Sequence, residues 1–454
     1  MALVLPTDIL IWLLVCAAAG FAWYCARRPH LAAPWRRVFS SRAAVASGTF
    51  LVFYLGVGLL DSLHYRPALL SKDPQAPAVY AVEVRSLLDA ALVSLRERQE
   101  RTYSAPLATR LYQKEQVERP DGTSVREFPR LRYGGARLKD ESDAPKDIAL
   151  LALSGLAVGM LVWAIVFMAM RHLLRRRQPA IPWNAGFAAL AVLLALAGPV
   201  AVLASQYHVL GTDKIGQDVL YQALKSIRTS LVIGTLTTLV LLPLGIGAGI
   251  AAGYFRGRVD DAIQYVYTTI NSIPGVLLIA ASVLMVQVYV DTNPALFPTT
   301  AQRSDFRLLM LCAILGGVGW TGLARLLRGE ALKISQLEYI QAAHAFGVSH
   351  ARVLLRHILP NVVHIVIITV VLEFSTLVLA EAVLSYIGVG VDPSTISFGT
   401  MINAARLEMA REPMVWWSLG TAFVFMFVLV LAANLFADAV RDGFDPRVRV
   451  GASR

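Results

Sequence analysis

The chain has 454 residues, of which 56% are hydrophobic and only 16% are charged. A soluble domain usually carries about 25% charged residues, so this composition indicates a protein that lies in a lipid bilayer. In a soluble protein the net charge of +11 would suggest nucleic acid binding. Here the basic residues follow membrane topology instead, so no nucleic acid partner is expected.

The apolar residues are grouped in long blocks. A helix that crosses a bilayer needs about 20 mainly apolar residues, and within lipid a helix satisfies its own backbone groups. The pattern predicts an all-α, polytopic transmembrane fold with about nine spans. They lie near residues 7–26, 44–62, 148–170, 184–205, 230–253, 262–290, 308–324, 362–387 and 416–440.

The loops between these spans alternate in charge. One set holds 20 Lys and Arg residues, and the opposite set of short loops holds 7. The positive-inside rule places the basic set in the cytoplasm, so we expect the N-terminus outside and the C-terminus in the cytoplasm. The basic set comprises loops 27–42, 171–177, 254–261, 325–361 and 441–454, and the opposite set comprises 206–229, 291–307 and 391–415.

Residues 63–147 interrupt the membrane pattern with 15 Lys/Arg and 13 Asp/Glu. By parity this insert lies outside the cytoplasm. Apolar residues recur near helical spacing over Ala78–Arg101, which predicts one amphipathic helix. Arg119–Lys146 is rich in charge, Pro and Gly, which is typical of a loop or weak hairpin. The insert is either a small extracytoplasmic cap or a spacer.

The chain divides into four predicted regions: extra N-terminal helices (1–62), the insert (63–147), a further helix with a basic loop (148–183) and a six-helix core (184–454). No G-x-x-x-x-G-K-[ST] phosphate loop is present, so any ATP hydrolysis needs another subunit. Neither G-x-S-x-G nor H-E-x-x-H occurs, and the three cysteines have no paired spacing. We expect no enzyme activity, cofactor or metal, although an intramembrane enzyme, or a sensor using 63–147 as its ligand domain, stays an alternative.

The segment Leu326–Asn361 is the most informative part of the core. A short helix is predicted from Tyr339 to Phe346, ended by Gly347 in a left-handed conformation. Ser349 is a candidate N-cap for a second helix, over 352–358. Two short helices joined by a bend would form a rigid projection that transmits force to a soluble partner. The alternative is an ordinary helical loop without a docking role.

This segment resembles the E-A-A-x-x-x-G loop of binding-protein-dependent ABC importer permeases, which is followed by I-x-L-P. Gln341 stands for the motif Glu and His357 for the motif Ile. The surrounding R-G-E, E-Y and R-H-I-L-P-N sequences resemble the peptide/nickel branch. The resemblance implies a coupling helix that docks on an ATPase through Glu338, Tyr339, Gln341, Ala342, Ala343, Gly347, Arg356, Leu359 and Pro360.

A second match, Leu210–Leu231, resembles the L-G-T-D-x-x-G-R-D-V segment of the same permeases, with Gln217 in place of Arg. Asp213 is predicted to cap a helix that begins near Lys214. His208, Asp213 and Asp218 would form an external metal site as an alternative, but three mixed ligands on one loop are a weak signal. The external motif residues are Gly211, Thr212, Asp213 and Asp218.

A third match, Leu379–Ile402, is similar to the family's L-A-E-A-S-L-S-F-L-G-L-G-V run. Glu381 and Glu373 are eight residues apart on one predicted span and fall near the same helix face. Ionisable residues within a span are costly and normally face a partner or a wet pathway. The two carboxylates therefore line the translocation path, or they form structural hydrogen bonds to a neighbouring helix.

Supporting matches lie at Ala252–Ile263 and Asn434–Arg447, so the resemblance covers about residues 206–447. It implies a MetI-like, type I ABC importer core preceded by about three extra helices. A different parse makes 44–62 the family's first helix, with 63–205 inserted after it. The implied partners are a second homologous permease, two cytoplasmic ATPases, an external substrate-binding protein and the bilayer of a bacterial inner membrane. Peptides are the implied substrate class.

Overall fold

The computed structural model describes residues 3–68, 80–118, 124–174 and 181–444. Several predicted features extend beyond these ranges: the start of the helix at Ala78, the start of the segment Arg119–Lys146, the basic loops 171–177 and 441–454, and the end of the tail motif at Arg447. Within the described residues, nine helices are long and apolar enough to cross a membrane. The predicted number of spans is therefore confirmed.

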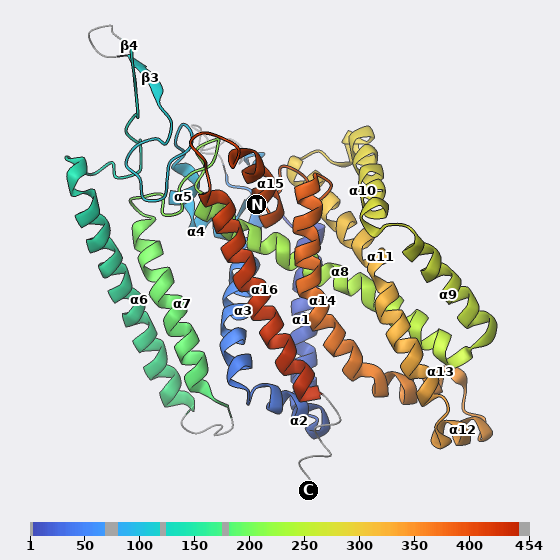
Figure 1. Ribbon diagram of the computed structural model, residues 1–454. Coiled ribbons are helices and arrows are strands. Elements are labelled where there is room, and N and C mark those ends of the chain that lie inside the picture. Colours follow the sequence, from blue (N-terminus) through green and yellow to red (C-terminus); the bar gives the residue numbers. More distant parts are fainter. Residues whose placement is uncertain (1–2, 69–79, 119–123, 175–180, 445–454) are drawn as a thin grey trace, which may run out of the picture. The chain divides into compact units, whose positions relative to one another are not determined.

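The chain forms two compact units, each made of discontinuous segments. Unit 1 comprises 1–4, 39–230 and 393–435, and unit 2 comprises 5–38, 231–392 and 436–454. Two helices, α8 and α16, begin in unit 1 and end in unit 2. Figure 1 shows the elements, which are α1 (Pro6–Ala26), α2 (Pro29–Val38), α3 (Arg42–Asp61), β1 (His64–Tyr65), β2 (Arg85–Ser86), α4 (Leu87–Ala91), α5 (Val93–Glu97), β3 (Glu115–Glu118), β4 (Ser124–Glu127), α6 (Ala144–Leu174), α7 (Trp183–Leu203), α8 (Val219–Phe255), α9 (Gly257–Ser272), α10 (Gly275–Thr292), α11 (Thr300–Ile334), α12 (Glu338–Ala345), α13 (His350–Val353), α14 (Leu359–Ile387), α15 (Phe398–Glu408) and α16 (Trp417–Phe444).

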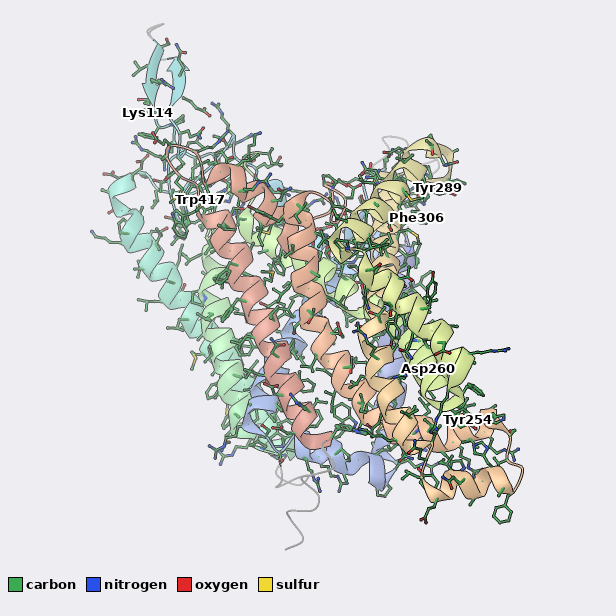
Figure 2. All side chains as sticks on the ribbon, turned by 45° about the vertical axis from the view of Figure 1, so that its right-hand side comes forward. Lys114, Tyr254, Asp260, Tyr289, Phe306 and Trp417 are labelled. Carbon is green, nitrogen blue, oxygen red and sulfur yellow. The ribbon has the colours of Figure 1, made fainter. Side chains whose placement is uncertain are left out.

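The predicted single span at 262–290 is wrong in its bounds. The helix breaks at Ile273 and Pro274, because proline has no backbone N–H to continue the ladder, and Ile273 is extended with φ −91° and ψ 131°. The spanning helix is α10, and α9 is a separate, more polar helix that does not meet the criteria for a span. Asp260 of α9 accepts two hydrogen bonds from Arg328 of α11, at 2.5 and 2.6 Å, and Figure 2 shows where Asp260 lies.

The insert contains less helix than predicted. Over the described part of Ala78–Arg101, the sequence predicts one long helix. The structure instead has β2 and two five-residue helices, α4 and α5. Ser86 and Asp89 form a capping box that starts α4 only at residue 87, and this capping interaction decides where helix begins. A hairpin is present, but it begins before the predicted segment Arg119–Lys146, because β3 (Glu115–Glu118) pairs antiparallel with β4 (Ser124–Glu127). This hairpin projects from the rest of the insert (Figure 1).

The insert packs against the helices that flank it in unit 1. Its Leu95 is buried in an apolar cluster with residues from the end of α7 and the start of α8. The other buried members of this cluster are Leu203, Ala204, Tyr207, Val209, Leu220 and Tyr221. A buried ionic group adds to this contact: the Lys225 ammonium lies 2.6 Å from Asp61 and 3.1 Å from Asp89. The insert therefore shares a core with residues of the neighbouring helices of unit 1.

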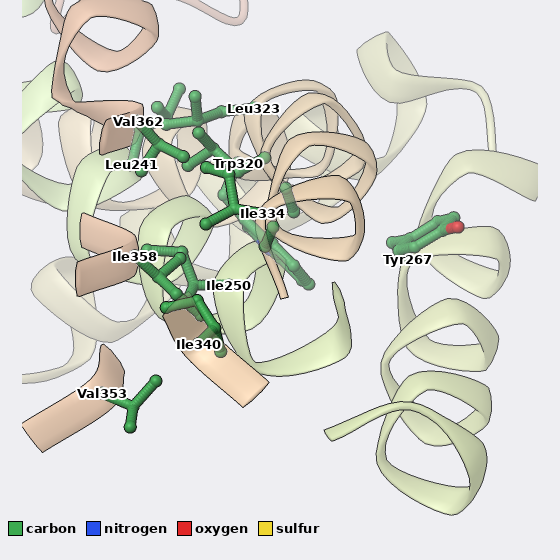
Figure 3. Close-up of a cluster of buried hydrophobic side chains, with 13 residues drawn as sticks. Leu241, Ile250, Tyr267, Trp320, Leu323, Ile334, Ile340, Val353, Ile358 and Val362 are labelled. Atoms are coloured by element: carbon green, nitrogen blue, oxygen red, sulfur yellow. The ribbon is translucent and has the colours of Figure 1, made fainter. Parts of the chain in front are cut away.

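The core of unit 2 joins the ends of α8, α11 and α14 to the loop between α11 and α14 (Figure 3). Leu327 of α11 and Ile340 of α12 are both fully buried in it. The α8 backbone comes close to α11 at Gly249 and Gly253, where added Cβ atoms would lie 2.7 Å from the Ala324 carbonyl oxygen and 2.4 Å from the Arg328 carbonyl oxygen. Small residues four apart permit such close approach of membrane helices.

This close approach predicts opposite effects for two neighbouring glycines on α8. Gly249→Ala places a methyl group against the α11 backbone, which costs about 1–3 kcal/mol as overpacking. Gly247 has nothing within 4 Å of its added Cβ, so Gly247→Ala should be neutral or stabilising by up to about 1 kcal/mol, because alanine favours helix. Thermal unfolding in detergent measures both variants. Equal melting temperatures for the two variants would contradict the packing described here.

Candidate functional site

The loop between α11 and α14 contains α12, which ends in a Schellman motif. Gly347 has φ +73°, as predicted for a left-handed residue after a helix. Val348 N–H donates to the Ala343 carbonyl at 3.0 Å and Gly347 N–H to the His344 carbonyl at 2.9 Å. These two bonds satisfy carbonyls that a helix end leaves free, so the bend after α12 has a defined geometry.

The two faces of α12 differ in what they contact. Ile340 is fully buried, and Ala343 packs against the same apolar core from its edge. On the other face, Gln341 and Ala342 are exposed, and Phe346 at the end of the helix has 87% of its surface exposed. The exposed face of α12 therefore consists of Gln341, Ala342 and Phe346, whereas Ala343 packs against the core.

Gln341, which stands where the motif has Glu, has a local function. Its side-chain Nε2 donates to the Gln336 carbonyl at 3.1 Å, just after α11 ends. An ionised carboxylate has no donor, so a glutamate could not form this bond. Tyr339 is also engaged, since its hydroxyl accepts a 3.1 Å hydrogen bond from Asn361 at the start of α14.

A group of aromatic and histidine side chains at the base of the loop was not predicted from the sequence. The Tyr254 hydroxyl, at the end of α8, lies 3.0 Å from His344 Nε2 and 2.8 Å from His350 Nδ1. Figure 2 shows Tyr254 beside this segment. Two residues further on, Arg256 donates to the Ser335 hydroxyl at 3.0 Å. The end of α8 thus contacts both the loop and the end of α11.

The second half of the loop differs from the predicted helix at 352–358. Ser349 is at the N-cap position, but its side chain makes no cap hydrogen bond, and α13 begins at His350. A π-helical turn, Leu354–Ile358, follows and leads directly into α14. Arg356 is exposed within this turn, and Leu359 and Pro360 form the first turn of α14.

The two candidate path residues have different surroundings. Glu381 has 1% of its surface exposed, and its Oε1 accepts a 2.7 Å hydrogen bond from Ser385 one turn along α14. Glu373 is half-buried. This hydrogen bond joins two residues of the same helix. Because ionisable groups in spans normally face a wet pathway or a partner, Glu373 is the stronger path candidate.

In unit 1 the external motif forms a turn followed by a helix cap, but the cap is not the predicted residue. Asp218 Oδ1 accepts N–H groups of Leu220 and Tyr221 at 2.8 and 3.3 Å, so Asp218 caps α8. Asp213 instead accepts from Ile215 and Gln217 at 3.0 and 2.8 Å. The prediction of Asp213 as a helix cap is wrong because the turn at 213–217 precedes α8.

Gly211 and Thr212 of the motif contact the insert and the start of α16. Gly211 has φ +75°, a left-handed conformation that glycine adopts readily. The Thr212 hydroxyl donates to the Thr102 carbonyl at 2.9 Å, and the Thr212 carbonyl accepts from Trp417 Nε1 at 3.0 Å. The insert, the motif and α16 therefore share one hydrogen-bonded contact in unit 1.

His208 lies between two carboxylates in the same region. Its Nδ1 is 2.8 Å from Asp218 and its Nε2 is 3.5 Å from Glu100 of the insert. Burial lowers the pKa of His208, but the bonds to Asp218 and Glu100 outweigh burial and raise its pKa to about 9. Glu100 is buried too, yet His208 and three backbone N–H groups lower its pKa. Glu100 was not predicted, because it is far from the motif in sequence.

The structure therefore separates the predicted residues into two groups. The coupling-loop residues and the two glutamates of α14 belong to unit 2, and the external motif belongs to unit 1. Within the described residues, no cluster of three or more His, Cys, Asp or Glu side chains is arranged to hold a metal ion. His208 and Asp218 contact one another, but Asp213 binds backbone groups and Gln222.

Comparisons with known proteins match the C-terminal half. The family described as "Binding-protein-dependent transport system inner membrane component" matches residues 245–450. The oligopeptide transport system permease protein OppC of Mycobacterium tuberculosis is 31% identical over 53% of this chain and 77% of its own length. The glutathione transport system permease protein GsiD of Pectobacterium atrosepticum is 31% identical over 54% of this chain and 74% of its own length. A chain of the inward-facing MetNI methionine ABC transporter has a TM-score of 0.39 at 15% identity, covering 50% of this chain and 98% of that one.

With nine candidate spans among its described residues, the chain is a polytopic membrane protein. The chain belongs to the binding-protein-dependent transport system inner membrane components, and it is a permease subunit of an ABC importer. The predicted family, fold class and transport function are confirmed. As a multi-pass inner-membrane subunit of this kind it works with ATPase and substrate-binding partners. The names of the matched relatives give no support to an enzyme or a sensor.

The charges around His208 predict a pH window for the stability of unit 1. The folded pKa of about 9 exceeds the ordinary value of 6.5, so the contribution of His208 is complete below about pH 6.5 and is lost as the pH rises through 9. The lowered pKa of Glu100 has the opposite effect on stability. Its stabilising contribution is complete above pH 4.5, the ordinary pKa of a glutamate, and is lost on acidification. For these two groups stability should be highest between about pH 4.5 and 6.5 and should decline from there towards pH 9.

Thermal unfolding in detergent at several pH values measures this window. His208→Gln should remove the alkaline decline and cost about 2–3 kcal/mol at neutral pH, the size of the pKa shift. His172→Gln, at an exposed histidine of α6, is the matched control. A wild-type chain that keeps its full stability at pH 10 would show that His208 is not charged in the folded state.

Proposed function

We propose that this permease forms half of the translocation path of a peptide importer. The support for peptides comes from the relatives named above, whose names specify oligopeptides and glutathione, and from a dipeptide permease of Lactococcus lactis that is 28% identical over 53% of this chain and 64% of its own length. A second homologous permease would supply the other half. We place the N-terminus outside and the C-terminus in the cytoplasm, from the charge asymmetry of the loops.

The coupling helix is α12, with two ATPase subunits expected below the two permeases. The observation that carries this proposal is the arrangement of the loop: one face of α12 is buried in the core of α8, α11 and α14, and the opposite face is exposed. A partner that moves α12 therefore moves the ends of three membrane helices with it. ATP binding would shift a two-state equilibrium between outward-open and inward-open paths.

Within the path, Glu373 is our candidate for contact with the transported molecule. It is half-buried within α14, whereas Glu381 is engaged by Ser385. A carboxylate at membrane depth would attract a cationic group such as the amino terminus of a peptide. Glu381 is assigned a structural role under this proposal.

Outside the membrane, the insert 63–147 would form a cap over unit 1. Its support is the buried contact with the external motif, through Thr212 and Glu100. A cap in this position would lie on the side from which a substrate-binding protein approaches. The boundaries of the four regions given under Sequence analysis remain part of this proposal.

The docking face gives a direct test of the coupling proposal. Ala342→Arg places a long charged side chain on the exposed face of α12 without filling the core, so it should abolish co-purification with the ATPase. Ala351→Arg is the matched control, because Ala351 is equally exposed but lies on α13. Both variants should reach the membrane at wild-type levels. Normal ATPase binding by Ala342→Arg would show that α12 is not the docking helix.

The path proposal predicts different defects for the two glutamates. Glu373→Gln should lower uptake of radiolabelled trialanine at least about tenfold, the effect of losing one charge-assisted contact, with unchanged thermal stability. Glu381→Gln should mainly lower stability, because it alters a buried hydrogen bond. Uptake and detergent melting curves measure both. Wild-type uptake by Glu373→Gln would show that Glu373 does not contact the transported molecule.

A further inference from the structure

The end of α8 meets the coupling loop through one hydroxyl group. Tyr254 is the second-last residue of α8. Its ring stacks on His344 with centroids 5.7 Å apart and an interplanar angle of 27°. His344 lies on α12 and His350 begins α13. The Tyr254 hydroxyl is within hydrogen-bond distance of both imidazoles, so it contacts the chain on each side of the bend at Gly347.

A tyrosine hydroxyl can form both bonds at the same time. It has one proton to donate and oxygen lone pairs to accept, so it donates to one imidazole and accepts from the N–H of the other. The bonds of 3.0 and 2.8 Å have ordinary lengths for such contacts. Because the Schellman motif holds the bend itself, these two bonds fix the orientation of the bend relative to α8.

We propose that Tyr254 is a positioning residue for energy coupling: its hydroxyl holds α12 and α13 in a fixed orientation on the end of α8. The proposal rests on the coupling function of α12 proposed above. Motion of α12 then reaches α8 through a polar contact that acts beside the apolar core. Arg256, between α8 and α9, makes the corresponding contact to Ser335 at the end of α11.

The test uses Tyr254→Phe, which removes the hydroxyl and keeps the stacked ring. Tyr265→Phe is the matched control, because Tyr265 lies on the neighbouring helix α9 with 74% of its surface exposed. Hydrogen exchange of the purified permease is measured by mass spectrometry over peptides covering 338–353. Loss of the two bonds should increase exchange there about tenfold in Tyr254→Phe and leave Tyr265→Phe at the wild-type rate.

A cycle of variants shows whether the hydroxyl acts through the histidines. If it does, adding Tyr254→Phe to a His344→Ala, His350→Ala chain should cause no further increase in exchange, because contacting residues are not additive. Unchanged exchange in Tyr254→Phe, or an equal further increase in the triple variant, would overturn the proposal.

The functional readout is the fold-stimulation of ATP hydrolysis by the external binding protein in proteoliposomes that hold the complete complex. Tyr254→Phe should keep ATPase association and lose most of this stimulation, whereas Ala342→Arg should lose association itself. Full stimulation in Tyr254→Phe would overturn the positioning role. Failure of the docking proposal can be told apart from failure of the positioning role. It would appear as normal ATPase association in Ala342→Arg and would leave the exchange result unchanged.

Discussion

The arrangement of unit 2 depends on the close approach of α8 and α11. Gly249 and Gly253 let the two backbones meet, and the apolar side chains around that contact extend without interruption into the loop that holds α12. Lipid tails are as apolar as the side chains, so exchanging lipid contacts for helix contacts gives no hydrophobic stabilisation. The close packing of small residues therefore determines which helices associate. A membrane contact and a loop outside the membrane therefore share one core. The loop between α11 and α14 is held in place because its buried face is continuous with that core.

The parts of the chain that could be predicted are those whose structure depends on local sequence properties. Hydropathy located the nine spans, since span length and composition are local properties. The break before α10 was missed, although Pro274 was visible, because the apolar blocks on either side of it have the combined length of one span. The insert was misjudged for a different reason: helical spacing over 78–101 was overridden by the cap at Ser86 and Asp89.

The candidate site shows a similar division. Motif residues such as Gly347 were placed correctly, because a left-handed helix end has a specific residue preference. Tyr254, His344 and His350 were not connected, because their proximity depends on the packing of α8 against the loop. Asp213 and Asp218 were both possible caps on one short segment, and only the path of the backbone distinguishes them. Pairings between distant segments, such as Glu100 with His208, had no local signal.

The π-helical turn at Leu354–Ile358 sets the rotational phase of everything that follows it. A π turn contains one residue more than the corresponding α-helical turn and is often found at functional sites. Deleting one residue there would restore an ordinary helix and rotate α14 by about 100° relative to α13. Glu373 and Glu381 would then face different neighbours, with no change in either side chain. The direction in which α14 presents its carboxylates is thus determined a few residues after α12, by helical register.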